Sequence, residues 1–235
     1  MAALTRTAWV PVTKKGNSEL LASRFGGLPA LPTGTEHPRC KACHADMPLF
    51  VQLNIDSLPA DARSQCPDVL HGKLLQFFYC TNDECNNQDF GAFAGNMLVR
   101  FVAVENTQFE VSDSEEVFLP KVIEAWKAVS DVPYLNEAYV HVHLDEDQKL
   151  ADDYDDYCNA LIAPLLHSGD KLLGWPDWIQ DVSYPNCAVC GKTMQYLVQI
   201  RSKDNVDYMF GDAGIGHICV CPKHIDKPSF YWSCT

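Results

Sequence analysis

The sequence contains no apolar run that approaches the roughly 20 residues of a membrane-spanning helix. Near the N-terminus, no long apolar stretch follows Arg6, and no small-residue cleavage site is evident. We therefore expect neither a signal peptide nor a membrane anchor. This favours a cytoplasmic location, where thiols stay reduced.

The sequence also lacks the common motifs of nucleotide binding and hydrolysis. It has no Gly-x-Ser-x-Gly, no Walker A loop and no dinucleotide fingerprint. Residues 211–216 are glycine-rich, but they precede an expected strand and lack a lysine, which predicts a tight turn. We find no coherent pair of nucleophile and base, and we predict that the protein is not an enzyme.

A basic cluster is missing as well. The 235 residues carry 18 Lys and Arg against 31 Asp and Glu, a net charge of −13. Residues 105–156 hold fifteen acids and three bases, while 1–104 hold nine of each and 157–235 hold seven acids and six bases. This balance disfavours nucleic acid and favours a basic protein partner.

We predict that the partner binds the most acidic part of this segment. Its candidate residues are Asp145, Glu146, Asp147, Asp152, Asp153, Asp155 and Asp156. The alternative is that 145–156 is the solvated face of a helix, and the sequence alone rates the two about equally.

What the sequence does contain is an internal similarity. Residues 24–53 align without a gap on 171–200 at an offset of 147, and eight of the 30 positions are identical. Unrelated segments of average composition share about two positions in 30. We predict one duplicated unit over 1–235, with a first half (1–104), an acidic connector (105–156) and a second half (157–235).

The expected fold class is α+β, with two mainly antiparallel β halves related by a pseudo-two-fold axis and with helices in the connecting segment. Apolar alternation and β-branched residues predict strands at 48–55, 74–79, 97–104, 138–144, 196–200, 217–220 and 229–232. Two helices are expected, one from Pro120 to about Val129 and one over about 147–166.

Eleven cysteines in a reducing compartment indicate metal ligands before disulfides. Each half has a Cys-x-x-Cys pair followed later by a second pair, so we predict two structural zinc sites. Their ligands are Cys40, Cys43, Cys80 and Cys85 in the first half, and Cys187, Cys190, Cys221 and His224 in the second. Cys219 is the rival of Cys221, because residues two apart on a strand share a face. The alternative for every site is a set of buried free thiols.

The spacing favours closed sites over a catalytic one. Pro-x-Cys-x-x-Cys in both halves is half of the zinc-deaminase signature, but the upstream His-x-Glu is missing. His141-Val142-His143 has no glutamate at the required place. Four protein ligands leave no open coordination position for a substrate or water.

Several of these stretches resemble a known family. Residues 25–29 (FGGLP), 48–54 (PLFVQLN) and 72–78 (GKLLQFF) resemble the YwqG-like family of bacterial proteins, as do 169–172, 174–176 and 211–216. The resemblance implies a duplicated α+β protein, and some family members are thought to be toxin-immunity proteins. A more distant likeness, carried by Cys-x-x-Cys, Met47, the Gln52 strand and Phe77-Phe78-Tyr79-Cys80, is to the programmed-cell-death-protein-2 group, which is linked to ribosomal-protein chaperoning.

These observations lead to one function hypothesis and two alternatives. The first is a non-enzymatic immunity protein that binds and blocks a basic toxin, such as a nuclease. The second is a chaperone of a basic ribosomal protein, and the third is a metal-dependent enzyme.

Overall fold

A computed structural model describes residues 4–86, 91–133, 137, 140 and 167–235. Short helical elements lie between two of its strands: η2 (Ile55–Ser57), α1 (Ala60–Arg63) and η3 (Asp68–Leu70). In chain order the strands are β1 (Arg6–Lys15), β2 (Arg24–Phe25), β3 (Ala30–Pro32), β4 (Leu49–Asn54), β5 (Lys73–Tyr79), β6 (Met97–Ala103), β7 (Phe109–Val111), β8 (Lys121–Asp131), β9 (Lys171–Leu173), β10 (Gln195–Arg201), β11 (Ile215–Val220) and β12 (Ser229–Ser233).

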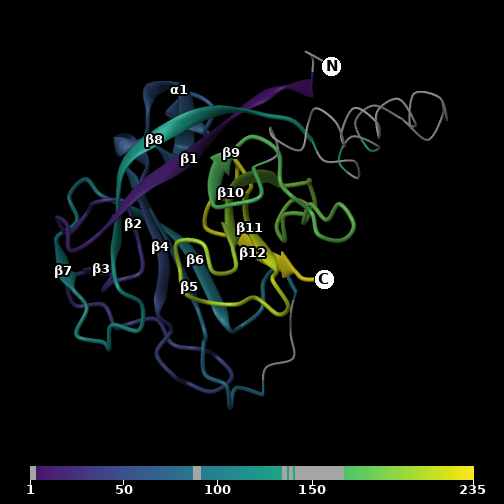
Figure 1. The fold of residues 1–235 in the computed structure, drawn as a ribbon. Helices are drawn as coiled ribbons and strands as arrows, with labels where there is room; N and C mark the ends of the chain where they lie inside the picture. Colours follow the sequence, from purple (N-terminus) through teal and green to yellow (C-terminus); the bar gives the residue numbers. More distant parts are fainter. Residues whose placement is uncertain (1–3, 87–90, 134–136, 138–139, 141–166) are drawn as a thin grey trace, which may run out of the picture.

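Ten of these strands form one sheet in the order β12-β11-β10-β9-β1-β8-β2-β4-β5-β6, and β3 pairs with β7 in a second, small sheet. All pairings are antiparallel. The long strands β1 and β8 lie side by side at the centre of the sheet (Figure 1). The strand order is symmetric about this pair, with four strands on either side.

The two outer strands of the large sheet come close to each other, so the sheet nearly closes on itself. The backbone N–H of Phe230 on β12 donates to the carbonyl of Ala92, just before β6 (3.2 Å). The indole N–H of Trp232 donates to the hydroxyl of Tyr79 (3.1 Å). This curvature lets one face of every long strand point into a shared interior.

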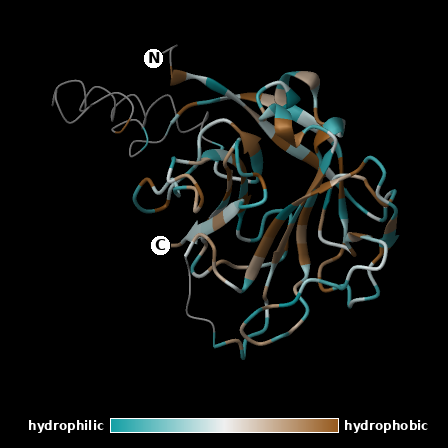
Figure 2. Cartoon of the chain, turned by 180° about the vertical axis from the view of Figure 1, so that it is seen from behind, coloured by the Kyte–Doolittle hydropathy of each residue, from teal (hydrophilic) through white to brown (hydrophobic). Residues whose placement is uncertain are grey.

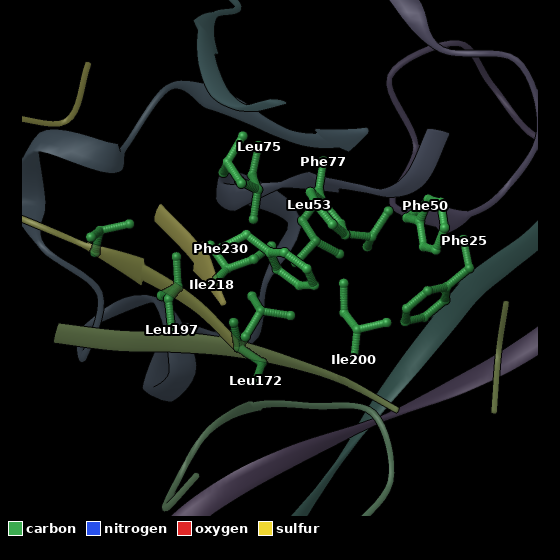
Figure 3. Close-up of a cluster of buried hydrophobic side chains, with 14 of the residues drawn as sticks. Phe25, Phe50, Leu53, Leu75, Phe77, Leu172, Leu197, Ile200, Ile218 and Phe230 are labelled. Carbon is green, nitrogen blue, oxygen red and sulfur yellow. The ribbon is translucent and has the colours of Figure 1, made fainter. Parts of the chain in front are cut away.

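That interior is the main hydrophobic core, and both halves of the chain contribute to it. Figure 3 shows Phe25, Phe50 and Phe77 of the first half facing Leu172, Ile200 and Phe230 of the second. Hydrophobic colour runs along the strands, while the connecting loops are largely hydrophilic (Figure 2). Two smaller apolar clusters surround the two sets of cysteines.

The expected α+β class is wrong, because the described chain is mainly β. The stretch after Leu119, expected to be a helix, is the central strand β8. Its apolar spacing is helix-like because Glu124 is an unpaired bulge residue: Ala125 pairs with Val12 and Ile123 with Thr13. A bulge adds one residue and shifts the alternation, so Ile123 and Trp126, three apart, both pack on the core.

All but one of the strand predictions are confirmed, as β4, β5, β6, β10, β11 and β12. The helix expected over 147–166 lies outside the described residues. Of the strand expected at 138–144 only Val140 is described, and it is helical, so the strand prediction is wrong there. The tight turn expected at 211–216 is confirmed, because Gly214 N–H bonds back to the carbonyl of Phe210 (2.8 Å) before β11 begins.

The same contacts recur in the two halves at an offset of 147. The buried amide of Gln52 donates to the carbonyls of Leu20 and Ala22 and accepts from Ala30 N. The buried amide of Gln199 donates to the carbonyls of His167, Ser168 and Gly169 and accepts from Asp177 N. Gln52 thereby links the loop before β2 to the start of β3, and Gln199 links the loop before β9 to the loop after it.

Central strands β1 and β8 are exchanged between the halves. β1 precedes β2 in the chain but pairs with β9, and β8 precedes β9 but pairs with β2. β1 and β8 also pair with each other. The segment 105–156 therefore contributes a strand to the middle of the sheet.

Candidate metal centres

Cys40, Cys43, Cys80 and Cys85, here called the first cluster, converge at one end of the first half. Cys40 and Cys43 lie in a tight loop closed by the bridge between Arg39 and Asp46. Cys80 directly follows β5, and Cys85 lies in the loop beyond it. The four Sγ atoms lie within 4.8 Å of one another.

Cys187, Cys190, Cys221 and His224, here called the second cluster, form the same arrangement in the second half. The bridge between Asn186 and Thr193 closes the loop of the first pair. Cys221 directly follows β11, and the N–H of His224 bonds to the Cys221 carbonyl in a short turn (3.1 Å). Their ligand atoms also lie within 4.8 Å of one another.

Backbone hydrogen bonds shape both loops in the same way. Cys40 N–H bonds to the carbonyl of Ala45 (2.9 Å), and Cys187 N–H to that of Lys192 (2.8 Å). The chain then turns through His44 (φ 60°) or Gly191 (φ 68°), both in the left-handed region. These turns aim two sulfurs per loop toward the strand that carries the second pair.

Each cluster combines buried and accessible ligands. Cys40 and Cys80 are buried, and Cys43 and Cys85 are half-buried. In the second cluster Cys187 and Cys221 are buried, while Cys190 is exposed and His224 is half-buried. Each group thus has the ligands and the spacing to hold a metal ion close to the surface.

One cysteine in each loop is stabilised as a thiolate, the form of cysteine that binds metal. The backbone N–H of Ala45 lowers the pKa of Cys43 to about 7. The backbone N–H of Cys190 lowers the pKa of Cys187 to about 6. A hydrogen bond to the charged form favours that form.

Burial has the opposite effect on other cysteines, including the cluster ligand Cys80, whose pKa it raises. Burial raises the pKa of Cys66 to about 11 and that of Cys219 to about 12. Both are buried, and Cys234 is half-buried. Cys219 packs beside the second cluster but is not among its four converging ligands, whereas Cys221 is. Cys158 lies outside the described residues.

The sequence reasoning missed a buried ion pair between Lys171 and Asp131. The Lys171 ammonium lies 2.9 Å from Asp131 Oδ2, and the two side chains are 2% and 0% exposed. The backbone N–H of Trp175 donates to the same oxygen (2.7 Å). The repeat alignment pairs Lys171 with Arg24 as a conservative match. Nothing in the sequence distinguished Asp131 from the other acids of its segment.

A second buried carboxylate was missed for the same reason. Glu137 is buried and accepts hydrogen bonds from the indole N–H of Trp178 (2.5 Å) and the hydroxyl of Tyr184 (2.6 Å). It is therefore part of the interior of the second half and not of an exposed acidic surface. The seven carboxylates predicted to bind a partner, over 145–156, lie outside the described residues, as do His141 and His143.

Two related four-ligand clusters on a mainly β chain define a protein with paired cysteine-rich loops. Residues 23–233 match the profile of a family described as "Domain of unknown function (DUF1963)", so the chain belongs to that family. This match is consistent with the resemblance to YwqG-like proteins. Over 53 residues the chain is also 34% identical to the "Uncharacterized protein YpfL" of Salmonella typhimurium (strain LT2). That alignment covers 23% of this chain and 12% of YpfL, so the chain spans a small part of that relative.

In the part of the chain that the structure describes, we find no helix with the length and apolar character needed to cross a membrane.

Proposed function

We propose that both clusters hold Zn²⁺ in closed structural sites and that the protein is a non-enzymatic protein-binding module. The observation that supports zinc is the spacing of the ligand atoms. Sulfur–sulfur distances are 3.7 Å for Cys40–Cys85, 3.6 Å for Cys43–Cys80 and 3.8 Å for Cys190–Cys221. A zinc tetrahedron with Zn–S bonds of about 2.3 Å has an edge of about 3.8 Å.

The histidine of the second cluster fits the same geometry. His224 Nδ1 lies 3.5 Å from Cys187 Sγ and 3.6 Å from Cys221 Sγ. A zinc ion with one Zn–N bond of about 2.0 Å requires an N–S edge of about 3.5 Å. With four protein ligands per ion, neither site leaves a position for substrate, which favours a structural over a catalytic role.

Metal analysis tests this part of the proposal. We expect two zinc ions per chain, about one in Cys40→Ser and in Cys187→Ser, and two in the control Cys66→Ser, whose thiol belongs to neither cluster. Cobalt-substituted protein should give a tetrahedral spectrum of full intensity at both sites. Full-length protein that contains no zinc and melts at the same temperature as the loaded form would contradict structural zinc, because such ions stabilise folds by about 10 kcal/mol.

We propose that the partner is a basic protein. Specifically, we propose that it is a toxin and that this chain is the immunity protein that binds and blocks it. Most of the net charge lies in 105–156. Within the described residues, two acids of this segment and two of the first half line a hollow of about 490 Å³ beside the β3–β7 sheet. Four exposed carboxylates line it: Glu36, Asp46, Glu110 and Asp113.

The basic groups in this hollow are already engaged. The guanidinium of Arg39 forms an ion pair with Asp46 (2.9 Å), and both ring nitrogens of His37 are bonded, to Ser112 and to the carbonyl of Met47. Glu110 also accepts from the backbone N–H of Gly34 (3.0 Å), which fixes its place. The hollow therefore presents an excess of negative charge, suited to a lysine or arginine of a partner.

Partner capture at low salt, followed by rate measurements, tests the proposal. We expect one basic toxin-like protein, and a fall of about tenfold in association rate at low salt for Glu110→Gln combined with Asp113→Asn. The control is Asp61→Asn with Asp68→Asn, the same charge change on α1 and η3. A second variant replaces Asp152, Asp153, Asp155 and Asp156 with asparagine.

Each other outcome has a definite meaning. A ribosomal protein as the captured partner would replace the immunity role with the chaperone role. Binding that is equally fast in both acidic variants and in the control would contradict the acidic surface. An open cobalt coordination position together with turnover of a substrate would favour the metal-dependent enzyme.

A further inference from the structure

The two halves place a buried cation at the same position but neutralise it differently. Arg24 on β2 pairs in register with Gln52, and Lys171 on β9 pairs with Gln199. Both cations are buried, with Arg24 5% and Lys171 3% exposed. Lys171 is neutralised by Asp131, as described above.

The position equivalent to Asp131 in the first half is occupied by Ser18. The pairing of the exchanged strands gives this correspondence. Trp9 on β1 lies between Leu172 and Ala128, and Lys121 on β8 lies between Phe25 and Lys15. Because Leu172 and Phe25 are equivalent at the offset of 147, Trp9 is equivalent to Lys121. Ala128 and Lys15 are thus equivalent, and three residues beyond them lie Asp131 and Ser18. The hydroxyl of Ser18 is buried and has no hydrogen-bond partner among the described residues.

A cavity of about 330 Å³ occupies the place of the missing carboxylate. Its walls include Ser18, Arg24, Gly27 and Leu28, which are the equivalents of Asp131, Lys171, Gly174 and Trp175. In the second half the backbone N–H of Trp175 donates to the Asp131 carboxylate (2.7 Å), and Leu28 carries the equivalent N–H. The cavity therefore joins a cation, a hydroxyl and a backbone N–H.

Arg24 has no carboxylate partner within the described residues. Its guanidinium donates to the carbonyls of Leu20 (2.9 Å), Ala22 (3.3 Å) and Leu28 (2.5 Å). These bonds use part of its five N–H donors. Burial lowers the pKa of Arg24 to about 10, so it remains a cation at neutral pH. The other charged residue that lines the cavity is Glu116, which is exposed.

We propose that this cavity binds a carboxylate supplied from outside the fold, in the place that Asp131 fills in the second half. A carboxylate is planar and accepts two parallel N–H bonds from a guanidinium, so it suits Arg24 better than a spherical anion does. The volume fits a small organic acid or the end of an extended peptide, at the lower limit of small-molecule sites. The proposal is independent of zinc and of the basic partner.

Thermal unfolding at constant ionic strength tests the site. In zinc-loaded wild-type protein, acetate or benzoate at about 30 times its Kd should raise the midpoint by about 4–8 °C over chloride. A peptide with a free C-terminal carboxylate, compared with its amidated form, separates a peptide source from a free acid. Saturation-transfer NMR on benzoate reports binding directly, without unfolding.

The matched variant is Ser18→Asp, which installs the carboxylate of the second half. We expect a midpoint about 5 °C above wild type without ligand, since a buried cation gains its partner, and no further rise with carboxylates. Ser18→Asn, of similar size but neutral, should show no such gain.

Three results would overturn the proposal. One is the absence of binding and of any midpoint shift with acetate, benzoate and the free-carboxylate peptide. The second is an equal response to chloride or inorganic phosphate, which would mean an unselective anion effect. The third is an undiminished carboxylate response in Ser18→Asp. A response to the peptide alone would keep the site and assign its ligand to a chain terminus.

Discussion

Asp170 and Ser23 hold equivalent positions in the two halves, but only one of them can carry a charge. Ser23 accepts from Asn54 N–H (3.0 Å) and contacts the Ser57 hydroxyl (3.1 Å). Asp170 accepts from Arg201 N–H (2.7 Å), and its own N–H donates to Asp204 (2.7 Å). The same structural role is thus filled by two hydroxyls in one half and by two carboxyls in the other.

This difference predicts a pH-dependent stability. Burial, and then the nearby Asp204 carboxylate, raise the pKa of Asp170 to about 7, above the value of about 3.9 in an unfolded chain. Between these two values the folded protein binds the extra proton, so its free energy of unfolding falls as pH rises from about 4 to about 7. The slope from this group is at most about 1.4 kcal/mol per pH unit.

The variant Asp170→Ser copies the first half and should remove this contribution. Urea unfolding of both proteins at pH 5, 6 and 7 measures it, with wild type losing more stability than the variant over this range. Parallel curves for the two proteins would show that Asp170 titrates normally in the fold.

Individual residues were predictable from sequence only where their chemistry repeats. Four of the eight proposed ligands lie in the two Cys-x-x-Cys motifs, and the other four follow a later expected strand in each half; the structure brings each set of four together. Gln52 and Gln199 were identical in the alignment, but their buried hydrogen bonds were not foreseen. The burial of Asp131 and Glu137 could not be predicted, because nothing in an acidic stretch of sequence distinguishes a buried carboxylate from an exposed one.

At the scale of elements, the cysteine loops of the two clusters share one backbone conformation but use different residues at the turn. His44 adopts φ 60° where its equivalent Gly191 adopts φ 68°. A side chain in the left-handed region costs about 1 kcal/mol, which glycine avoids. A Cβ at Gly191 would meet no atom within 4 Å, so this cost is purely one of backbone conformation.

Exchanging these residues should shift stability in opposite directions. We expect His44→Gly to stabilise the zinc-loaded protein by up to about 1 kcal/mol and Gly191→His to destabilise it by about the same amount. Differential scanning calorimetry detects each as a midpoint change of about 2–4 °C. Changes of the same sign in both variants would mean that side-chain contacts, and not the turn, decide the effect.

Strand β8 shows why the element prediction failed. A spacing of three and four apolar residues normally indicates a helix. In β8 the bulge at Glu124 inserts one residue, and two core-facing side chains on a strand come to lie three residues apart. Nothing local marks the bulge, since its register is set by β1, more than a hundred residues earlier in the chain.

At the scale of the whole molecule, the exchange of β1 and β8 means that neither half can complete its part of the sheet without the other. Of the two sheet neighbours of β1, β8 belongs to the connector 105–156 and β9 to the second half, while both neighbours of β8, β1 and β2, belong to the first half. The sequence revealed the 147-residue offset of the repeat. The sequence could not reveal the exchange of β1 and β8, because the repeat alignment does not show which strands are neighbours in the sheet.

A chain divided in the loop before β8 should therefore fold only when both parts are present. We expect fragments 1–116 and 117–235, each with zinc, to be poorly folded alone and to form one folded complex when co-expressed. Hydrogen exchange on the isolated fragments and on the mixture measures this, with protection of β1 amides appearing only in the complex. Full protection of β1 in the isolated first fragment would show that the exchange is not required for folding.

The position of β1 also sets an order of events during synthesis. It leaves the ribosome before either strand with which it pairs, and the nearer of these begins at Lys121, roughly 5–20 seconds later at typical translation rates. In that interval Trp9, destined for the core, has no strand to cover it. A cell that makes this protein must shield or tolerate an unpaired β1 while the ribosome adds the residues between Lys15 and Lys121.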